Sequence, residues 1–205
     1  RLQVETVDLY QCHWPDTNTS ISETLAELTK MQKEGKIRYI GVSNFDLTLL
    51  QEAYRQAEMV SLQPHYSLLE RRIEAEILPF CRENNLGVLA YGPLAGGILT
   101  GKYAVRPDFP ETDARNFFYK FFKEPYWSQV QNLLDTLKNI AVRHNRPLAQ
   151  VAINWIRSQP GITSALVGCR SREQVESNAR AEEWELSKEE LEEIEKVYQS
   201  SLTRK

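Results

Sequence analysis

The chain has 205 residues, of which 41% are hydrophobic and 26% charged, as in an ordinary globular domain. Its 25 basic and 28 acidic side chains give a net charge of −3, so no basic surface points to nucleic acid or an anionic membrane as a partner. The three cysteines lie far apart, and the sequence shows neither a signal-peptide pattern nor an apolar run of roughly 20 residues. We therefore expect neither disulfides nor a metal site. We expect the protein to be cytoplasmic.

In the first half of the chain, short apolar segments alternate with amphipathic ones. The pattern predicts strands at residues 7–13, 37–42, 59–63 and 87–91, separated by helices at 20–36, 46–57 and 71–83. Ser20 or Ser22 is a suitable N-cap for the first helix, and Asp46 for the second. Strands joined by helices in this way predict βαβ units in a parallel sheet.

The second half begins with a long irregular stretch that is rich in aromatic residues and runs to about residue 125. Helices are predicted at 128–144, 148–158, 172–181 and 187–198, the last introduced by the capping-box pattern S-K-E-E. A fifth strand is predicted at 164–167. Five strands in all are therefore expected.

Polar, aromatic and glycine residues follow the predicted strands at their carboxyl ends, where parallel α/β folds place their chemistry. They are His13, Trp14, Ser43, Asn44, Gln63, Tyr91, Gly168 and Arg170. Packing alone accounts poorly for such residues at the end of every strand. A single histidine in this position is more often a core or surface residue, so the alternative for His13 is a packing role.

Four segments, in this order, resemble the aldo-keto reductases, a family that also includes the β subunits of voltage-gated potassium channels. They read D-L-Y-Q-C-H-W-P-D, K-I-R-Y-I-G-V-S-N-F, Y-G-P-L-A-G-G-I-L-T-G-K-Y and V-G-C-R-S-R-E-Q-V-E-S-N. The resemblance covers essentially residues 1–205 and implies a single domain with the (β/α)8 TIM-barrel fold. It also implies that NADPH is bound in an extended form without a G-x-G-x-x-G fingerprint, and the sequence contains no such fingerprint.

The resemblance implies a role for each matching residue. His13 falls on the catalytic histidine that orients and polarises the substrate carbonyl, and Trp14 on an aromatic position of the substrate pocket. Three side chains fall on the groups that bind the nicotinamide carboxamide, and they are Ser43, Asn44 and Gln63. Tyr91 falls on the aromatic residue that stacks against the nicotinamide ring.

The remaining matches concern the phosphates and the adenosine. The loop near the pyrophosphate corresponds to Gly92, Pro93, Leu94, Ala95 and Gly96, with Lys102 beyond it. The adenosine and 2′-phosphate end corresponds to Gly168, Arg170, Gln174 and Asn178. An arginine just before a helix suits a 2′-phosphate, so NADP(H) is expected, with NAD(H) as the weaker alternative because Gln174 stands where a second basic residue is frequent.

The family's reaction also uses an Asp, a Tyr and a Lys, the first two within a D-T-A-x-x-Y-G type motif that is absent from this sequence. The resemblance therefore implies that the chain holds strands four to eight of the barrel and lacks the first three βα units. Five strands do not close a barrel. A missing N-terminal part or a homo-oligomeric partner is expected to complete it, and the chain alone is expected to be inactive.

Three functions remain open: an NADPH-dependent reductase of small aldehydes or ketones, a non-catalytic nucleotide-binding or regulatory protein, and an inert fragment. Several assignments also have alternatives. Arg170 could pair with Glu173 or Glu176 on the surface, and the aromatic segment 117–127 could be a membrane-binding stripe instead of the expected flap. His65 and His144 are predicted to be structural, and the acidic run at 182–195 a solvated helix face.

Overall fold

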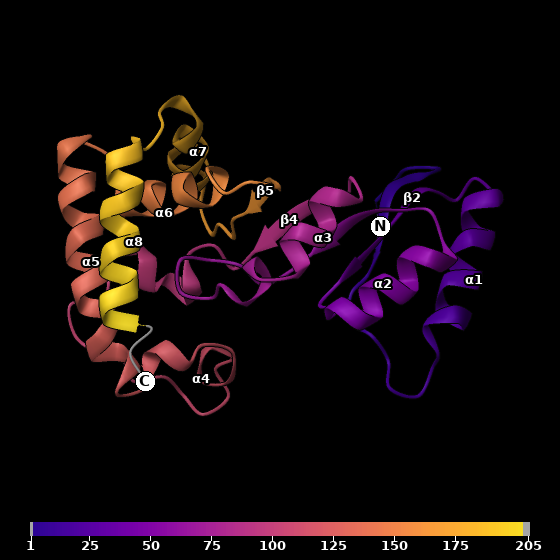
Figure 1. Cartoon of the computed structure of the whole chain (residues 1–205), viewed down its shortest axis with the longest axis horizontal. Coiled ribbons are helices and arrows are strands. Elements are labelled where there is room, and N and C mark those ends of the chain that lie inside the picture. Colours follow the sequence, from indigo (N-terminus) through magenta and orange to yellow (C-terminus); the bar gives the residue numbers. More distant parts are fainter. Residues whose placement is uncertain (1, 203–205) are drawn as a thin grey trace. The chain divides into compact units, whose positions relative to one another are not determined.

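A computed structural model describes residues 2–202 and contains one five-stranded sheet (Figure 1). Its strands follow one another in chain order: β1 Val7–Cys12, β2 Ile37–Ser43, β3 Met59–Gln63, β4 Gly87–Tyr91 and β5 Ile162–Leu166. The pairs β1–β2, β2–β3 and β3–β4 are parallel. The predicted α/β class with a parallel sheet is therefore confirmed.

The contacts divide the chain into two compact units. The first unit comprises the chain up to His65, Arg72–Tyr91 and Pro160–Ser164. The second unit comprises Tyr66–Arg71, Gly92–Gln159 and the chain from Ala165 onward. Each unit has its own buried apolar core, and each is described separately below.

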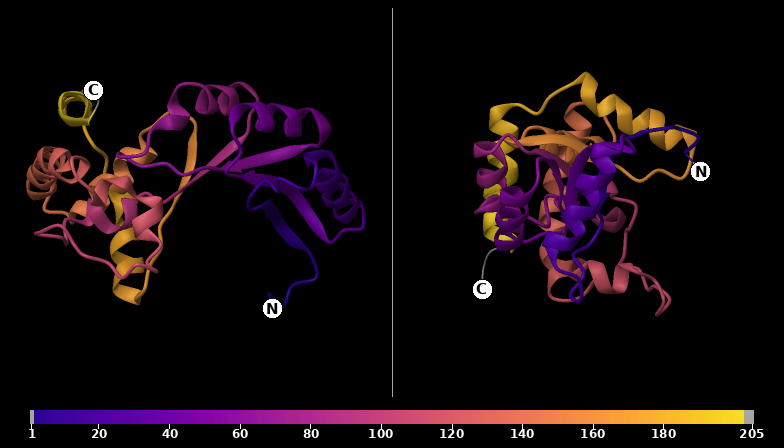
Figure 2. Two further views of the ribbon diagram at one scale, coloured as in Figure 1. Left: turned by 90° about the horizontal axis from the view of Figure 1, so that it is seen from below. Right: turned by 90° about the vertical axis from the view of Figure 1, so that its right-hand side faces the viewer.

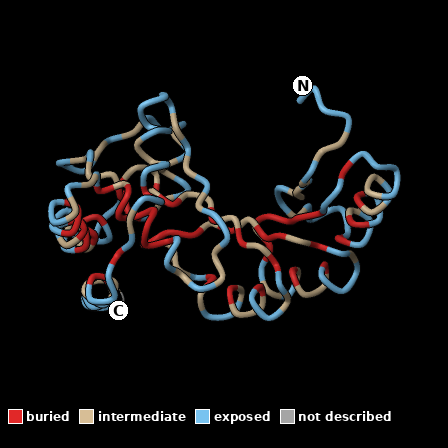
Figure 3. Tube along the Cα trace, turned by 90° about the horizontal axis from the view of Figure 1, so that it is seen from above, coloured by how far each residue is buried: buried red, intermediate tan, exposed pale blue. Residues whose placement is uncertain are grey.

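In the first unit, three helices pack on one face of the strands (Figure 2). They are α1 Ile21–Lys33, α2 Leu47–Gln56 and α3 Ile77–Glu83, with a 3-10 turn η1 at Arg72–Glu74. Ser20 and Glu23 form a capping box at the start of α1, and Asp46 caps α2 as predicted. In Figure 3 the buried positions of these helices lie along one side only, as expected of amphipathic helices on a sheet.

The second unit is mainly helical. Its helices are α4 Arg115–Phe118, α5 Tyr126–Arg143, α6 Leu148–Arg157, α7 Arg172–Ala179 and α8 Lys188–Leu202. Three 3-10 segments join them: η2 Ala95–Thr100, η3 Lys120–Phe122 and η4 Arg180–Glu183. The long helix α5 packs against both α6 and α8 (Figure 1), burying a stripe of apolar side chains that includes Leu133, Leu137 and Ile140.

Three predicted elements differ from the structure. The helix predicted at 71–83 is broken, and α3 begins only at Ile77, because Pro79 has no N–H to donate to residue 75 and its ring crowds that carbonyl. The helix predicted at 172–181 ends at Ala179 and tightens into η4. The last strand starts two residues earlier than predicted, at Ile162.

The acidic run at 182–195 is not a uniformly solvated face, so this prediction is wrong in part. Glu190 is buried, and its carboxylate lies 2.9 Å from His144 Nε2 and accepts a hydrogen bond from the N–H of Ser187 at 3.0 Å. The His144 ring also packs on Trp184, with centroids 4.4 Å apart. His144 therefore has the structural role predicted for it, and one glutamate of the acidic run, Glu190, is buried.

Among the residues that the structure describes, no helix combines the length and the apolar character required to cross a membrane. Within the same part of the chain, no group of three or more His, Cys, Asp or Glu side chains is arranged to hold a metal ion.

Candidate functional site

Asn44 connects the carboxyl ends of three strands in the first unit. Its Nδ2 donates to the backbone oxygen of His13 at 2.9 Å, just beyond β1, and its Oδ1 accepts from the hydroxyl of Tyr91, the last residue of β4, at 2.7 Å. Asn44 itself follows β2 and has a φ of +62°, a left-handed conformation that asparagine tolerates better than most residues. Asn44 thus links the strand-end residues His13 and Tyr91.

Ser43 and Gln63 belong to the same hydrogen-bond network. The hydroxyl of Ser43 donates to the backbone oxygen of Gln63 at 2.7 Å and accepts from Asn44 Nδ2 at 3.0 Å. The two residues are register partners in β2 and β3, so their side chains project from the same face of the sheet. Four of the residues predicted to bind the carboxamide or to stack on the ring thus lie within one bonded network.

Gln11, to which the resemblance assigns no role, extends this network. Its Oε1 accepts from Gln63 Nε2 at 2.6 Å, and its own Nε2 donates to Ser61 Oγ at 3.2 Å. Gln11, Gly41 and Ser61 are successive register partners across β1, β2 and β3. The side chain of Gln11 therefore crosses β2 over Gly41, which has no side chain to block it.

His13 and Trp14 follow directly after β1, and both side chains are exposed. Their rings lie 6.0 Å apart between centroids at an angle of 53°. The neighbouring Cys12 is half-buried, which raises the pKa of its thiol despite a hydrogen bond from Sγ to the backbone oxygen of Trp14. Cys12 is consequently protonated at neutral pH.

His65, which the sequence predicts to be structural, lies against Tyr91. The two rings are nearly parallel, at 8°, with centroids 5.0 Å apart, and the N–H of Tyr91 donates to the backbone oxygen of Pro64 at 2.9 Å. One face of Tyr91 is therefore covered by an imidazole. The signal that could have revealed this is the position of His65, two residues after Gln63 at the end of β3.

In the second unit, the loop after β4 turns sharply through Gly92, Pro93, Leu94, Ala95 and Gly96. Gly96 and Gly97 have φ values of +66° and +98°, which only glycine adopts readily. A Cβ at Gly97 would lie 2.9 Å from the ammonium nitrogen of Lys102, so this cation rests against the backbone of the loop. The structure thus brings together Lys102 and the glycine-rich loop.

The residues predicted for the adenosine end lie just before α7 or on it, also in the second unit. Gly168 is open to solvent, and the exposed Arg170 uses its backbone N–H to donate to Gln174 Oε1 at 2.8 Å. Asn178, one turn further along, donates to the Sγ of Cys169 at 3.3 Å. Glu176, considered above as a partner for Arg170, pairs instead with Arg172 at 2.6 Å.

The aromatic segment before α5 packs largely inside its own unit, since Phe121, Phe122 and Trp127 are buried while Phe117 and Phe118 are exposed. Upstream of it, the Arg115 guanidinium donates to Asp113 at 2.8 Å and lies 3.8 Å from the centre of the Phe109 ring. The hydrogen bonds from Arg115 lower the pKa of Asp113 to about 2, with a smaller contribution from the charge of Arg170. Asp113 is therefore ionised at every physiological pH.

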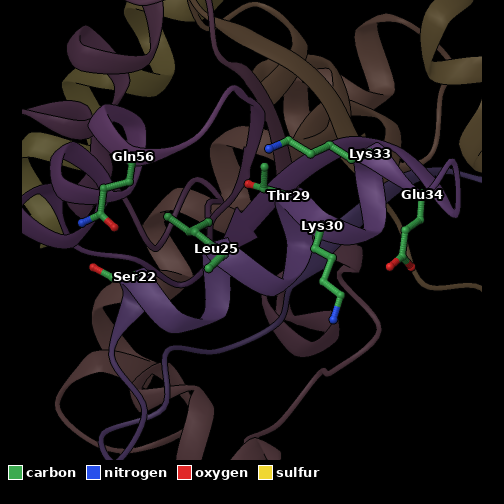
Figure 4. A pocket seen from close by; sticks show the side chains of 8 residues that line it. Ser22, Leu25, Thr29, Lys30, Lys33, Glu34 and Gln56 are labelled. Atoms are coloured by element: carbon green, nitrogen blue, oxygen red, sulfur yellow. The ribbon is translucent and has the colours of Figure 1, made fainter.

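A groove of about 550 Å³ lies apart from these residues, along α1 of the first unit (Figure 4). It is lined by Ser22, Leu25, Ala26, Thr29, Lys30, Lys33, Glu34 and Gln56. None of the residues predicted from the sequence to bind cofactor or substrate lines it.

Comparison with known proteins agrees with the resemblance seen in the sequence. The Aldo/keto reductase family model matches residues 1–199. The chain is 35% identical over 204 residues to the Bacillus subtilis aldo-keto reductase YhdN, covering 99% of this chain and 61% of that protein. It is also 35% identical over 184 residues to an Escherichia coli protein described as NADH-specific methylglyoxal reductase, covering 88% and 56% of the two chains.

Solved structures give the same result. A glycerol dehydrogenase from Gluconobacter oxydans superposes with a TM-score of 0.91 at 35% identity, over 100% of this chain and 62% of that one. A thermostable aldo-keto reductase in complex with the inhibitor epalrestat superposes with a TM-score of 0.74 at 29% identity, over 96% and 61%. The chain spans about three fifths of the length of these relatives. Because the family model and the curated relatives both match along nearly its whole length, the chain belongs to the aldo-keto reductase family.

Proposed function

We propose that the chain is the nicotinamide-binding part of an oxidoreductase that reduces aldehyde or ketone carbonyls to alcohols. The observation that carries this proposal is the hydrogen-bond network that joins His13, Asn44, Ser43, Gln63 and Tyr91 at the ends of four strands. These are the residues that match the family's catalytic histidine and nicotinamide site. Such a cluster of neutral amide and hydroxyl groups is suited to a neutral carboxamide, and the imidazole of the adjoining His13 to a carbonyl.

The chemistry of the residues fits the proposed cofactor. Ser43, Asn44 and Gln63 offer hydroxyl and amide groups to the carboxamide, and Tyr91 offers a flat ring to the nicotinamide. The positive φ of Gly96 and Gly97 and the ammonium group of Lys102 suit phosphate oxygens, because glycine lets backbone N–H groups approach an anion closely. Gly168, Arg170, Gln174 and Asn178 are proposed to hold the adenosine end.

When bound, the nicotinamide supplies the hydride that reduces the carbonyl carbon. The exposed imidazole of His13 is proposed to donate a hydrogen bond to the carbonyl oxygen and so to orient the substrate. The bond from Asn44 to the backbone oxygen of His13 fixes the chain from which that imidazole projects. Trp14, exposed beside it, is proposed as an apolar wall for the substrate.

NADP(H) is proposed as the preferred cofactor and NAD(H) as a weaker one. The exposed guanidinium of Arg170 suits a 2′-phosphate, since arginine pairs with phosphate through parallel hydrogen bonds. Gln174 adds no charge there and accepts from the backbone of Arg170. One relative is described as an NADH-specific reductase, so NAD(H) is kept as the alternative.

We further propose that the five strands correspond to strands four to eight of a (β/α)8 barrel that forms a single domain in a cytoplasmic protein. The Asp, Tyr and Lys that the family's reaction uses would then come from an additional N-terminal part or from a partner chain. A non-catalytic nucleotide-binding role is the second candidate. It is favoured by the absence of the D-T-A-x-x-Y-G type motif from these 205 residues.

The proposal is tested by titrating the chain with NADPH and NADH in a calorimeter and assaying reduction of a small aldehyde. Binding of NADPH is expected, tighter than that of NADH, without turnover by the chain alone. Mixing with a polypeptide that carries the barrel strands containing the Tyr and Lys is expected to restore turnover, and His13→Ala to abolish it again. Failure to bind either dinucleotide would exclude both candidate functions, and binding without turnover in the complemented protein would leave the non-catalytic one.

A further inference from the structure

Gln11 and Gln63 form a pair of amides whose donors and acceptors are ordered. Gln63 Nε2 donates to Gln11 Oε1 at 2.6 Å, and Gln11 Nε2 donates in turn to Ser61 Oγ at 3.2 Å. Ser61 is buried and Gln63 is half-buried. A hydrogen bond between groups withdrawn from water is costly to leave unmade, so the two amides are held against each other.

The hydrogen-bond donors and acceptors of Asn44 can also be assigned to partners. An amide nitrogen carries two donors, and those of Asn44 are both used, one on the backbone oxygen of His13 and one on Ser43 Oγ. Its Oδ1 accepts from Tyr91 and keeps a second lone pair. The hydroxyl proton of Ser43 is donated to the backbone of Gln63. The groups that remain to meet a ligand at this end of the sheet therefore include the carbonyl oxygens of Asn44 and Gln63, together with the second N–H of Gln63.

We propose that Gln11 is a positioning residue that fixes the orientation of the Gln63 amide and thereby makes this site selective for a ligand that carries an amide N–H donor. This inference rests on the proposed function, in which that donor is the NH₂ group of the nicotinamide carboxamide. Gln11 does not touch the ligand itself. It acts by holding the nitrogen of Gln63, so that the oxygen of the same amide faces the ligand.

Gly41 makes this arrangement possible. It lies between Gln11 and Ser61 in the register row, and a Cβ at this position would come within 2.4 Å of Ser61 Oγ and 3.0 Å of Gln11 Cγ. No side chain larger than hydrogen fits there without displacing one of the two partners. Glycine is therefore required at position 41 for the close approach of its neighbours and not for its backbone angles.

The test compares two ligands that differ only in the group recognised. The first is NADP⁺, and the second is its 3-acetylpyridine analogue, in which a methyl group replaces the NH₂. Dissociation constants are measured by calorimetry for the full chain and for three variants. Gln11→Leu removes both hydrogen bonds, Gln11→Glu keeps only acceptors toward Gln63 Nε2, and Gln56→Leu is the matched control on the exterior of α2.

The chain and the Gln56→Leu control are expected to bind NADP⁺ about tenfold more tightly than the analogue, as expected of one hydrogen bond to a half-buried acceptor. Gln11→Leu is expected to reduce this ratio, with the oxygen of Asn44 left as an acceptor. Gln11→Glu is expected to keep it, because a carboxylate forces Gln63 to donate and so leaves its oxygen toward the ligand. A role in folding alone would weaken both ligands equally and leave their ratio unchanged.

The inference is overturned if Gln11→Leu keeps the ratio of the unaltered chain, or if the chain binds both ligands equally. Should Gln11→Leu fail to fold, as judged by circular dichroism, Gln11→Glu decides, and loss of the ratio in that variant overturns the inference as well. If the unaltered chain binds neither NADP⁺ nor NAD⁺, the proposed function itself fails. That outcome is distinguishable, because in the other cases the dinucleotide is bound.

Discussion

Replacing Asn44 by alanine is expected to destabilise the first unit by about 4 kcal/mol, counted from the contacts of this one residue. The side chain makes three hydrogen bonds, with His13, Ser43 and Tyr91, and each contributes about 1 kcal/mol. The φ of +62° adds about 1 kcal/mol, because a Cβ in the left-handed region crowds the following carbonyl and alanine lacks the polar side chain that helps asparagine.

The two contributions are separated by a second variant, Asn44→Gly. Glycine also loses the three hydrogen bonds, but it adopts a positive φ without strain, so its loss is expected to be about 1 kcal/mol smaller than that of alanine. Urea unfolding followed by far-ultraviolet circular dichroism gives both values from the midpoints, provided that the slopes agree. The reasoning is refuted if alanine costs less than about 1 kcal/mol, or if glycine is no more stable than alanine.

Three further outcomes follow from the structure. Glu190→Gln removes the charge that faces His144 and is expected to cost about 1–2 kcal/mol at pH 7. Burial alone would raise the pKa of Glu190, but its hydrogen bonds and its cationic neighbours lower it. The difference in the free energy of unfolding between variant and parent should therefore be fully present above the unfolded pKa near ~4.3, and it should disappear as the pH falls through the folded pKa. A difference that does not change with pH contradicts this. Gly97→Ala is expected to cost about 1–3 kcal/mol in urea unfolding, because of its φ of +98° and the overlap with Lys102, and an unaltered midpoint would contradict the loop geometry. Burial raises the pKa of Cys81 to about 12, so iodoacetamide at pH 8 should leave this thiol unmodified until urea is added, as peptide mass mapping would show.

Much of the sheet could be predicted because its strands are short apolar runs with clear boundaries. β3 and β4 have the predicted bounds, and Asp46 is the predicted cap. The helix predicted at 71–83 failed because periodicity alone does not register the missing donor of Pro79. The burial of Glu190 was missed for a related reason, since a run of acids gives no sign that one of them faces a partner far along the chain.

The gathering of His13, Asn44 and Tyr91 could be predicted from topology, because parallel strands bring their carboxyl ends to one edge. Their bonding pattern could not. Gln11 and Gln63 are 52 residues apart, and nothing local to either marks the other as its partner. Such a contact depends on the register between strands, which only the folded sheet defines.

The exposed indole of Trp14 gives the first unit an optical probe of its own. The chain has four tryptophans, and the other three, Trp127, Trp155 and Trp184, all belong to the second unit. Trp127 and Trp155 are buried, whereas Trp14 is 51% exposed, so its emission should lie at longer wavelength than theirs. In a Trp14→Phe variant the remaining fluorescence reports on the second unit alone, and the difference spectrum against the parent isolates events beside His13.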